Sequence, residues 1–188
     1  MPKILEGTEK KNRRPKMRKK KEDVLTQQQP QDIMTIITDS REQNKFLFPR
    51  EINSIVSTLK TGDYSILSME NLICVERKSH ADFYQSLGSS RERFEREILR
   101  MAEFERACFI TTVSLEEFLK PPVYNKGFTL FESKLNPRSA INSIISYQVK
   151  YNIPTIFAGS QQLGMVYTLR FLEKFWKYKK EKEGEILL

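Results

Sequence analysis

Two acidic residues and a lysine stand where two neighbouring short strands would bring them to one face of a sheet. Asp63 opens one β-rich run, and Glu76 and Lys78 close the next, with a turn at residues 69–71 between them. Side chains alternate along a strand, so Glu76 and Lys78 point to the same face, which Asp63 on the adjacent strand can also reach. The pattern therefore predicts a β-hairpin that places three charged groups together.

The rest of the chain predicts a sheet with helices on both sides. Short β-branched or apolar runs predict strands at 34–38, 54–59, 64–67, 72–76, 107–113 and 154–158. Apolar residues at helical spacing, together with capping signals, predict helices at 79–87, 90–105 and 163–180, a short helix that begins at Ser114, and a further helix that begins at Pro137. Residues 121–136 have no clear period, so we expect a loop there. A strand-rich front half followed by alternating helix and strand indicates an α/β fold.

The predicted cluster suits the hydrolysis of phosphodiester bonds. Carboxylates bind a hard divalent cation such as Mg²⁺, which neutralises charge in the transition state and lowers the pKa of its water. Lys78 can hold the attacking water or offset the new negative charge. Asp39 ends the first predicted strand and can add a third carboxylate, and Glu42 can hold a ligand or a water.

The sequence lacks the residues and motifs that several other kinds of catalytic or binding site require. The single histidine, His80, excludes a histidine cluster, and the two distant cysteines, Cys74 and Cys108, provide no zinc site of the usual kind. Both cysteines lie in apolar runs, which is typical of buried thiols in a reducing compartment. Neither a GxxxxGK[ST] nor a GxGxxG motif occurs.

A purely structural interpretation exists for the charged residues. Glu76 and Lys78 can form an exposed ion pair that contributes little to stability. The arginines at positions 93, 96 and 100 fall at the spacing of an i,i+4 network with Glu92 and Glu97, which we favour over a row of phosphate contacts.

The positive charge of the chain is concentrated near its N-terminus. The net charge is +8, and residues 1–30 hold ten of the 32 Lys and Arg residues. Like charges this dense resist folding, so we expect residues 1–31 to form a basic disordered tail and linker. The tail can serve as a nucleic-acid arm, as a nuclear localisation signal, or only as a solvated segment with nonspecific affinity.

The sequence predicts neither a secretory signal nor a membrane span. Its N-terminus is charged without an apolar run, and the longest uncharged stretch, residues 151–169, is interrupted by polar residues and a proline. We therefore expect an intracellular protein, which would be nuclear in a eukaryotic host.

At these residues the sequence resembles the XPF-type structure-specific endonucleases. Their motif, GDx(n)ERKxxxD, is a variant of the PD-(D/E)XK nuclease signature. The matching positions in this chain are Gly62, Asp63, Glu76, Arg77, Lys78 and Asp82. The element at residues 38–42 and the run at 83–97 extend the match, which covers roughly residues 34–158.

The resemblance implies a restriction-endonuclease-like (PD-(D/E)XK) fold with a central mixed sheet flanked by helices. We expect the nuclease domain to span residues 32–188, which include the C-terminal helix. The implied metal ligands are Asp39, Asp63, Glu76 and the carbonyl of Arg77. Lys78 would position the nucleophilic water, and Arg77 and Asp82 would support the site, with Asp82 at the start of the following helix. Glu42 is carried over as a further catalytic residue. The expected DNA-binding residues are Arg41, Arg91, Lys19, Lys20 and Lys21.

The expected function is a Mg²⁺-dependent endodeoxyribonuclease, in which Mn²⁺ can substitute, acting on branched, flapped or recombination-intermediate DNA. Members of the resembled family usually continue into tandem helix-hairpin-helix modules, whereas this chain looks like a compact stand-alone member. The C-terminal helix could then provide a homodimer or heterodimer contact. The alternatives are a catalytically silent DNA-binding or scaffold subunit of a nuclease heterodimer, and an RNA-binding accessory protein driven by the basic tail.

Overall fold

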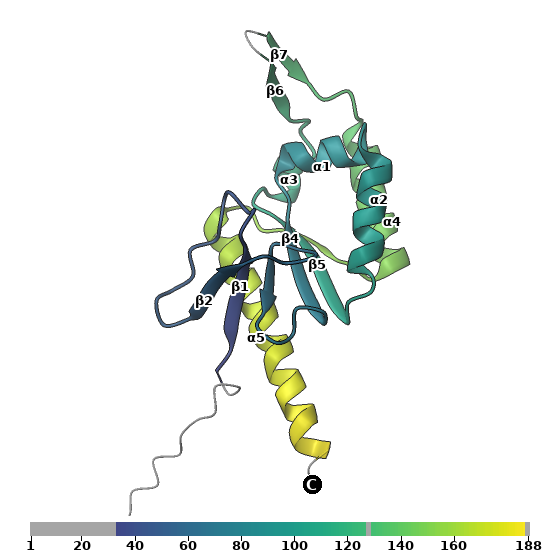
Figure 1. Ribbon diagram of the computed structural model, residues 1–188. Coiled ribbons are helices and arrows are strands. Elements are labelled where there is room, and N and C mark those ends of the chain that lie inside the picture. Colours follow the sequence, from purple (N-terminus) through teal and green to yellow (C-terminus); the bar gives the residue numbers. More distant parts are fainter. Residues whose placement is uncertain (1–32, 127–128, 187–188) are drawn as a thin grey trace, which may run out of the picture.

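A six-stranded mixed sheet forms the centre of the molecule, in the strand order β2-β1-β3-β4-β5-β8 (Figure 1). The computed structural model describes residues 33–126 and 129–186, so the predicted tail at residues 1–31, including Lys19, Lys20 and Lys21, lies outside the described residues. The strands of the central sheet are β1 (Thr35–Asp39), β2 (Asn53–Ser57), β3 (Tyr64–Ile66), β4 (Ile73–Arg77), β5 (Arg106–Thr111) and β8 (Thr155–Phe157). Strand β1 is parallel to β2 and antiparallel to β3, β3 is antiparallel to β4, and the pairs β4–β5 and β5–β8 are parallel.

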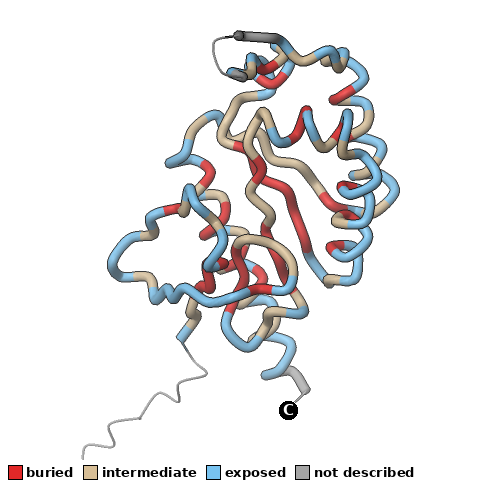
Figure 2. The backbone as a smooth tube through the Cα atoms, turned by 45° about the horizontal axis from the view of Figure 1, so that its top comes forward, coloured by how far each residue is buried: buried red, intermediate tan, exposed pale blue. Residues whose placement is uncertain are grey.

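Helices pack on both faces of this sheet. They are α1 (His80–Leu87), α2 (Arg91–Met101), α3 (Leu115–Phe118), α4 (Pro137–Tyr151) and α5 (Gln161–Ile186). One core joins α1, α2, α3 and α4 to the sheet through residues such as Phe83, Phe94 and Phe109, and a second joins α5 to the opposite face through Tyr64 and Leu172. The buried segments accordingly run through the central strands and the inward sides of the helices (Figure 2). The predicted mixed sheet with flanking helices is confirmed.

The structure corrects the prediction of a loop at residues 121–136. Strands β6 (Val123–Lys126) and β7 (Thr129–Glu132) pair with each other in a hairpin that projects away from the main sheet, at the top of Figure 1. The sequence of these two short strands has no clear apolar period, so the hairpin is not recognisable from it. The hydroxyl of Tyr124 donates a hydrogen bond to the Ala81 carbonyl at 3.1 Å, which ties the hairpin to α1.

Helix boundaries follow local capping. The Ser79 hydroxyl accepts a hydrogen bond from the Asp82 amide and begins α1, and Asn136 caps α4 one residue before Pro137. Helix α2 ends at Met101 and not at residue 105 as predicted, because residues 102–105 turn the chain into β5 and the Phe104 amide donates to the Met101 carbonyl.

The C-terminal helix has both buried and exposed apolar residues. In α5, Leu169, Leu172 and Phe175 are buried, whereas Leu163 and Val166 are exposed. A dimer contact through this helix stays a prediction. No helix in the described ranges is long and apolar enough to cross a membrane.

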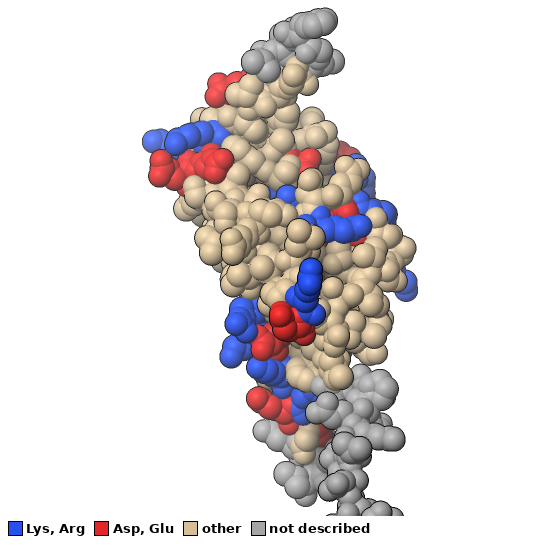
Figure 3. All heavy atoms as spheres, turned by 90° about the vertical axis from the view of Figure 1, so that its left-hand side faces the viewer, with Lys and Arg blue, Asp and Glu red and all other residues tan. Residues whose placement is uncertain are grey.

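The charged side chains of α5 form mixed-sign groups along its length. Glu173 pairs with Arg170 at 2.6 Å and with Lys177 at 2.8 Å, and Lys180 pairs with Glu183 at 3.2 Å. On the face of the molecule shown in Figure 3, Lys and Arg atoms lie beside Asp and Glu atoms in small groups separated by uncharged surface. Among the described residues, this face therefore has no continuous basic patch.

Candidate active site

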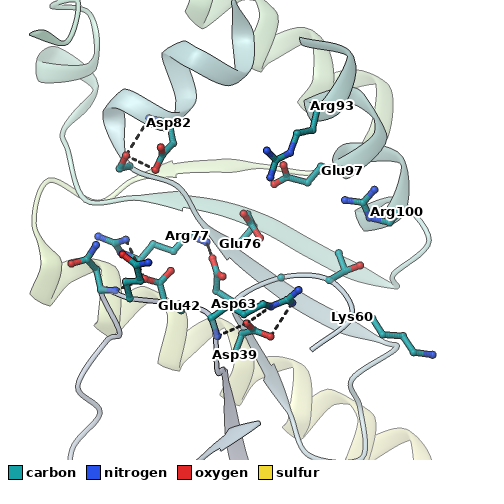
Figure 4. A pocket seen from close by; sticks show the side chains of 16 residues that line it. Asp39, Glu42, Lys60, Asp63, Glu76, Arg77, Asp82, Arg93, Glu97 and Arg100 are labelled. Carbon is teal, nitrogen blue, oxygen red and sulfur yellow. Dashed lines mark hydrogen bonds and ion pairs between the residues drawn. The ribbon is translucent and has the colours of Figure 1, made fainter. Parts of the chain in front are cut away.

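A cleft of about 480 Å³ opens where β1 and β4 end and β3 begins, with α2 as its far wall (Figure 4). The predicted residues that line it are Asp39, Arg41, Glu42, Asp63, Glu76, Arg77 and Asp82. Lys78 lies just behind them, in a smaller hollow that α1 and α2 border. The fold therefore brings together all the catalytic residues predicted from the sequence.

The backbone of Asp63 is fixed between two strands. Its amide donates to the Val75 carbonyl at 2.8 Å, and its carbonyl accepts from the Asp39 amide at 2.7 Å. One carboxylate oxygen accepts from the Arg77 amide at 2.8 Å. Burial raises the pKa of Asp63 to about 7, and the negative charge of nearby Glu42 adds to this rise against the Arg77 hydrogen bond.

Glu76 and Lys78 are partners, as their spacing predicts, but they are not an exposed pair. The Lys78 ammonium lies 3.4 Å from Glu76 and only 9% of its side chain is exposed. Burial and the charge of Asp63 raise the pKa of Glu76 well above its usual value. Two carboxyl groups are thus held close together in a partly dry site, where their mutual repulsion favours the binding of a cation.

Lys78 has a second acidic partner that the sequence analysis missed. Glu97 on α2 lies 3.0 Å from the Lys78 ammonium, and the ammonium sits 5.3 Å from the ring centroid of Phe94 and 5.8 Å from that of Phe109. Burial alone would lower the pKa of Lys78, but Glu76 and Glu97 outweigh it and raise that pKa. Lys78 is therefore held in its charged form.

Asp39 is engaged by a neighbouring arginine. Its carboxylate accepts from the Arg41 amide and from the Arg41 side chain, through Nε at 2.8 Å and Nη2 at 3.1 Å, and from the Leu59 amide at 2.7 Å. Burial acts to raise the pKa of Asp39, but these hydrogen bonds outweigh it and the pKa is lowered. Arg41 therefore lies at the site, where its hydrogen bonds orient the Asp39 carboxylate.

Arg77 links the site to the loop after β1. Its Nη1 lies 3.7 Å from Glu42, and its guanidinium lies 5.8 Å from the ring centroid of Phe46. Phe46 in turn stacks on Tyr64 at 5.1 Å and donates its amide to the Tyr64 hydroxyl. These contacts hold Arg77 with 11% of its side chain exposed, which fixes the backbone that follows Glu76.

Asp82 lies in the first turn of α1, as predicted. The Ser79 hydroxyl donates to its carboxylate at 2.6 Å, and the same hydroxyl accepts from the Asp82 amide at 3.1 Å. Asp82 therefore stabilises the start of α1 at the mouth of the cleft, where a negative charge also interacts well with the helix dipole.

The donor set has the chemistry that a hard cation prefers: carboxylate oxygens and a backbone carbonyl. Within residues 33–126 and 129–186, however, no three His, Cys, Asp or Glu side chains converge as a ready cluster for one ion. The engagement of Asp39 by Arg41 and the Leu59 amide provides a physical reason. Mg²⁺ is commonly held by one or two carboxylates with waters and substrate phosphates, and Asp63 and Glu76 can supply these carboxylates.

The arginines of α2 are arranged differently from the predicted network. Arg91 pairs with Glu95 at 3.3 Å and lies 5.7 Å from the ring centroid of Tyr147, outside the cleft. Glu97 pairs with Lys78, and the predicted i,i+4 pairs of the arginine row do not form among the described residues. A role of Arg91 in DNA binding stays a prediction.

Comparisons with known proteins agree with this architecture. The model of the ERCC4 domain matches residues 34–171. The fold is similar to that of XPF from Aeropyrum pernix in complex with DNA, with a TM-score of 0.53 and 23% identity over 78% of this chain and 66% of that chain. A second structure of XPF from Aeropyrum pernix has a TM-score of 0.55 and 21% identity, over 81% of this chain and 68% of that chain.

No curated protein matches the sequence. The chain spans about two thirds of the length of the XPF chain in the DNA complex. Both the resemblance to XPF-type endonucleases and the predicted restriction-endonuclease-like fold are confirmed by the family match and the structural similarity.

Proposed function

The chain belongs to the ERCC4 domain family, and on that premise we propose that it is a divalent-metal-dependent endonuclease that hydrolyses phosphodiester bonds in DNA. The observation that supports this most is the placement of Asp63 and Glu76 in one cleft, with the Lys78 ammonium 3.4 Å from Glu76. Two neighbouring carboxylates beside a buried ammonium are costly to assemble for stability alone. They suit a reaction in which negative charge develops on phosphate oxygens.

Each residue has a separate task in this proposal. Asp63, Glu76 and the Arg77 carbonyl would hold Mg²⁺ or Mn²⁺. The Asp39 carboxylate would become a further ligand once its contact with the Arg41 side chain is broken. The bound ion supplies charge neutralisation and a water of lowered pKa. Lys78, kept charged by Glu76 and Glu97, would orient the attacking water and stabilise the charge that forms on the phosphate.

The substrate we propose is DNA with branches, flaps or recombination junctions. Support comes from membership of the ERCC4 domain family and from the similarity to an XPF structure that was determined in complex with DNA. The cleft is open and lined by polar and charged side chains, which suits a phosphate backbone better than a small apolar ligand.

The test compares four labelled substrates: a duplex, a splayed arm, a flap and a four-way junction. Wild-type protein is expected to cut at least one of them in Mg²⁺ or Mn²⁺, and an excess of EDTA is expected to abolish cutting while DNA binding persists. Binding without cutting in either metal would overturn the nuclease proposal and favour the scaffold subunit. Equal cutting with and without EDTA would show that the reaction does not depend on a divalent metal ion.

Glu97 provides an independent check on the role of Lys78. Glu97→Ala leaves the Lys78 ammonium with Glu76 alone, so we expect kcat to fall by about 10- to 100-fold, as for other groups that orient catalytic residues. Glu97→Gln keeps an oxygen acceptor at the same place and should restore part of this loss. KM for DNA should change little in both variants. A fall in KM and kcat together, without rescue by Gln, would mean that Glu97 has another role.

A further inference from the structure

Two arginines of α2 face the candidate active site and have no partner among the described residues. Arg93 and Arg100 both line the cleft, on the wall opposite the strands that hold Asp39 and Asp63 (Figure 4). Within the described part of the chain, neither guanidinium makes an ion pair or a hydrogen bond. This is notable because the same cleft is lined by several carboxylates, with which an arginine side chain would readily pair.

The positions of the two arginines fit an extended anionic ligand. They are seven residues apart, which is two helical turns and about 10 Å along the axis of α2, and places them on one side of the helix. Lys60, also without a partner among the described residues, lines the same cleft from the segment before β3. Cations at three separated points along one opening match a ligand with repeated negative charges better than a single anion.

Resting on the proposed function, we propose that Arg93 and Arg100 bind two phosphates of the DNA strand that enters the cleft, on the α2 side of the scissile bond. An unpaired guanidinium offers a planar set of donors for phosphate oxygens. Its charge also offsets the repulsion that Asp39, Asp63 and Glu76 would exert on a polyanion. The two arginines thus fix the path of the strand beside the carboxylates.

The same helix contains a matched control. Arg96 lies between the two arginines in sequence, is exposed and has no partner among the described residues, but it does not line the cleft. Removal of Arg96 changes the net charge of the protein by the same amount as removal of Arg93 or Arg100. A difference between these variants therefore reports position and not charge.

The experiment measures the affinity for a labelled DNA flap over a series of salt concentrations, in Ca²⁺, for wild type and for Arg93→Ala, Arg96→Ala and Arg100→Ala. Each lost phosphate contact lowers the slope of log K against log[salt] by about 0.9. We expect this change for Arg93→Ala and Arg100→Ala, with about a 10-fold loss of affinity at moderate salt, because each variant loses charge-assisted hydrogen bonds to a phosphate. Arg96→Ala should keep the wild-type slope.

Equal slopes in all four proteins would overturn the inference, as would equal losses in all three variants, which would indicate general electrostatic attraction. Cutting by wild type in Mg²⁺ is measured in parallel. If wild type cuts and Arg93→Ala binds with an unchanged slope, only the phosphate contacts are rejected. If wild type binds with the expected slopes and cuts none of the substrates, the nuclease proposal fails while the phosphate contacts stand.

Discussion

Asp63→Asn is expected to abolish DNA cutting while the protein stays folded. The substitution keeps the shape of the side chain and an oxygen that can accept from the Arg77 amide, but it removes the charge that would bind the cation. We expect kcat to fall by at least about 100-fold, since the loss of one preorganised charge-stabilising group costs on the order of 10²–10³ in rate. The measurement is single-turnover cutting of the preferred substrate in Mg²⁺.

The pKa of Asp63 gives this variant a second readout. Because folding raises that pKa from 3.8 to about 7, the folded protein binds more protons than the unfolded chain between these values. Wild-type stability should therefore fall as pH rises from about 4 to about 7, and the contribution of Asp63 to this fall is absent in Asp63→Asn. In EDTA at pH 8, the variant should melt at the same temperature as wild type or higher.

The control for this pair of readouts is Glu103→Gln, which removes one negative charge from an exposed residue that does not line the cleft. It should cut and melt like wild type. An Asp63→Asn protein that melts well below wild type at pH 8 would mean that Asp63 stabilises the fold, and its loss of activity would then say nothing about metal. Undiminished cutting by a folded Asp63→Asn protein would remove Asp63 from the reaction.

The part of the site that lies on strands could be predicted from the sequence. The two-residue spacing of Glu76 and Lys78 predicts one shared face, and the turn at residues 69–71 predicts that β3 and β4 are neighbours. The structure confirms both, with the two side chains 3.4 Å apart. Strand alternation is a local property, so it holds whatever packs on the sheet.

The contribution of α2 could not be predicted in the same way. Helical periodicity identifies which residues of α2 share a face, but the partner of that face depends on how the helix crosses the sheet. The helical spacing therefore predicts that Glu97 pairs along its own helix, whereas Glu97 contacts Lys78, which follows β4. The same spacing predicts pairs along the helix for Arg93 and Arg100, which instead line the cleft.

The contact between Arg41 and Asp39 was missed for another reason. A motif indicates which residues are needed, but not which of them are engaged by a neighbour until the ligand is present. The short element after β1 folds Arg41 back onto Asp39 through its own amide and its side chain. Only the course of the backbone after Asp39 reveals this contact.

Gly62 determines whether Asp63 can take its place between the strands. Its φ is +81°, a conformation that side chains with a Cβ rarely adopt. A Cβ at this position would lie 2.8 Å from the Cβ of Cys74 and 3.3 Å from the Val75 carbonyl oxygen. Cys74 is fully buried in β4, so neither obstacle can move aside without disturbing the sheet.

Gly62→Ala is therefore expected to lower the free energy of unfolding by about 2–6 kcal/mol, from backbone strain of about 1–3 kcal/mol and overpacking of similar size. Urea denaturation measures this change, and Gly184→Ala is the matched control. Gly184 lies in α5, and a Cβ there would meet nothing within 4 Å, so alanine should be neutral or stabilise by up to about 1 kcal/mol. A Gly62→Ala protein within about 0.5 kcal/mol of wild type would show that the β3–β4 hairpin adapts. The position of Asp63 would then depend on its hydrogen bonds to Asp39 and Val75 and not on the glycine.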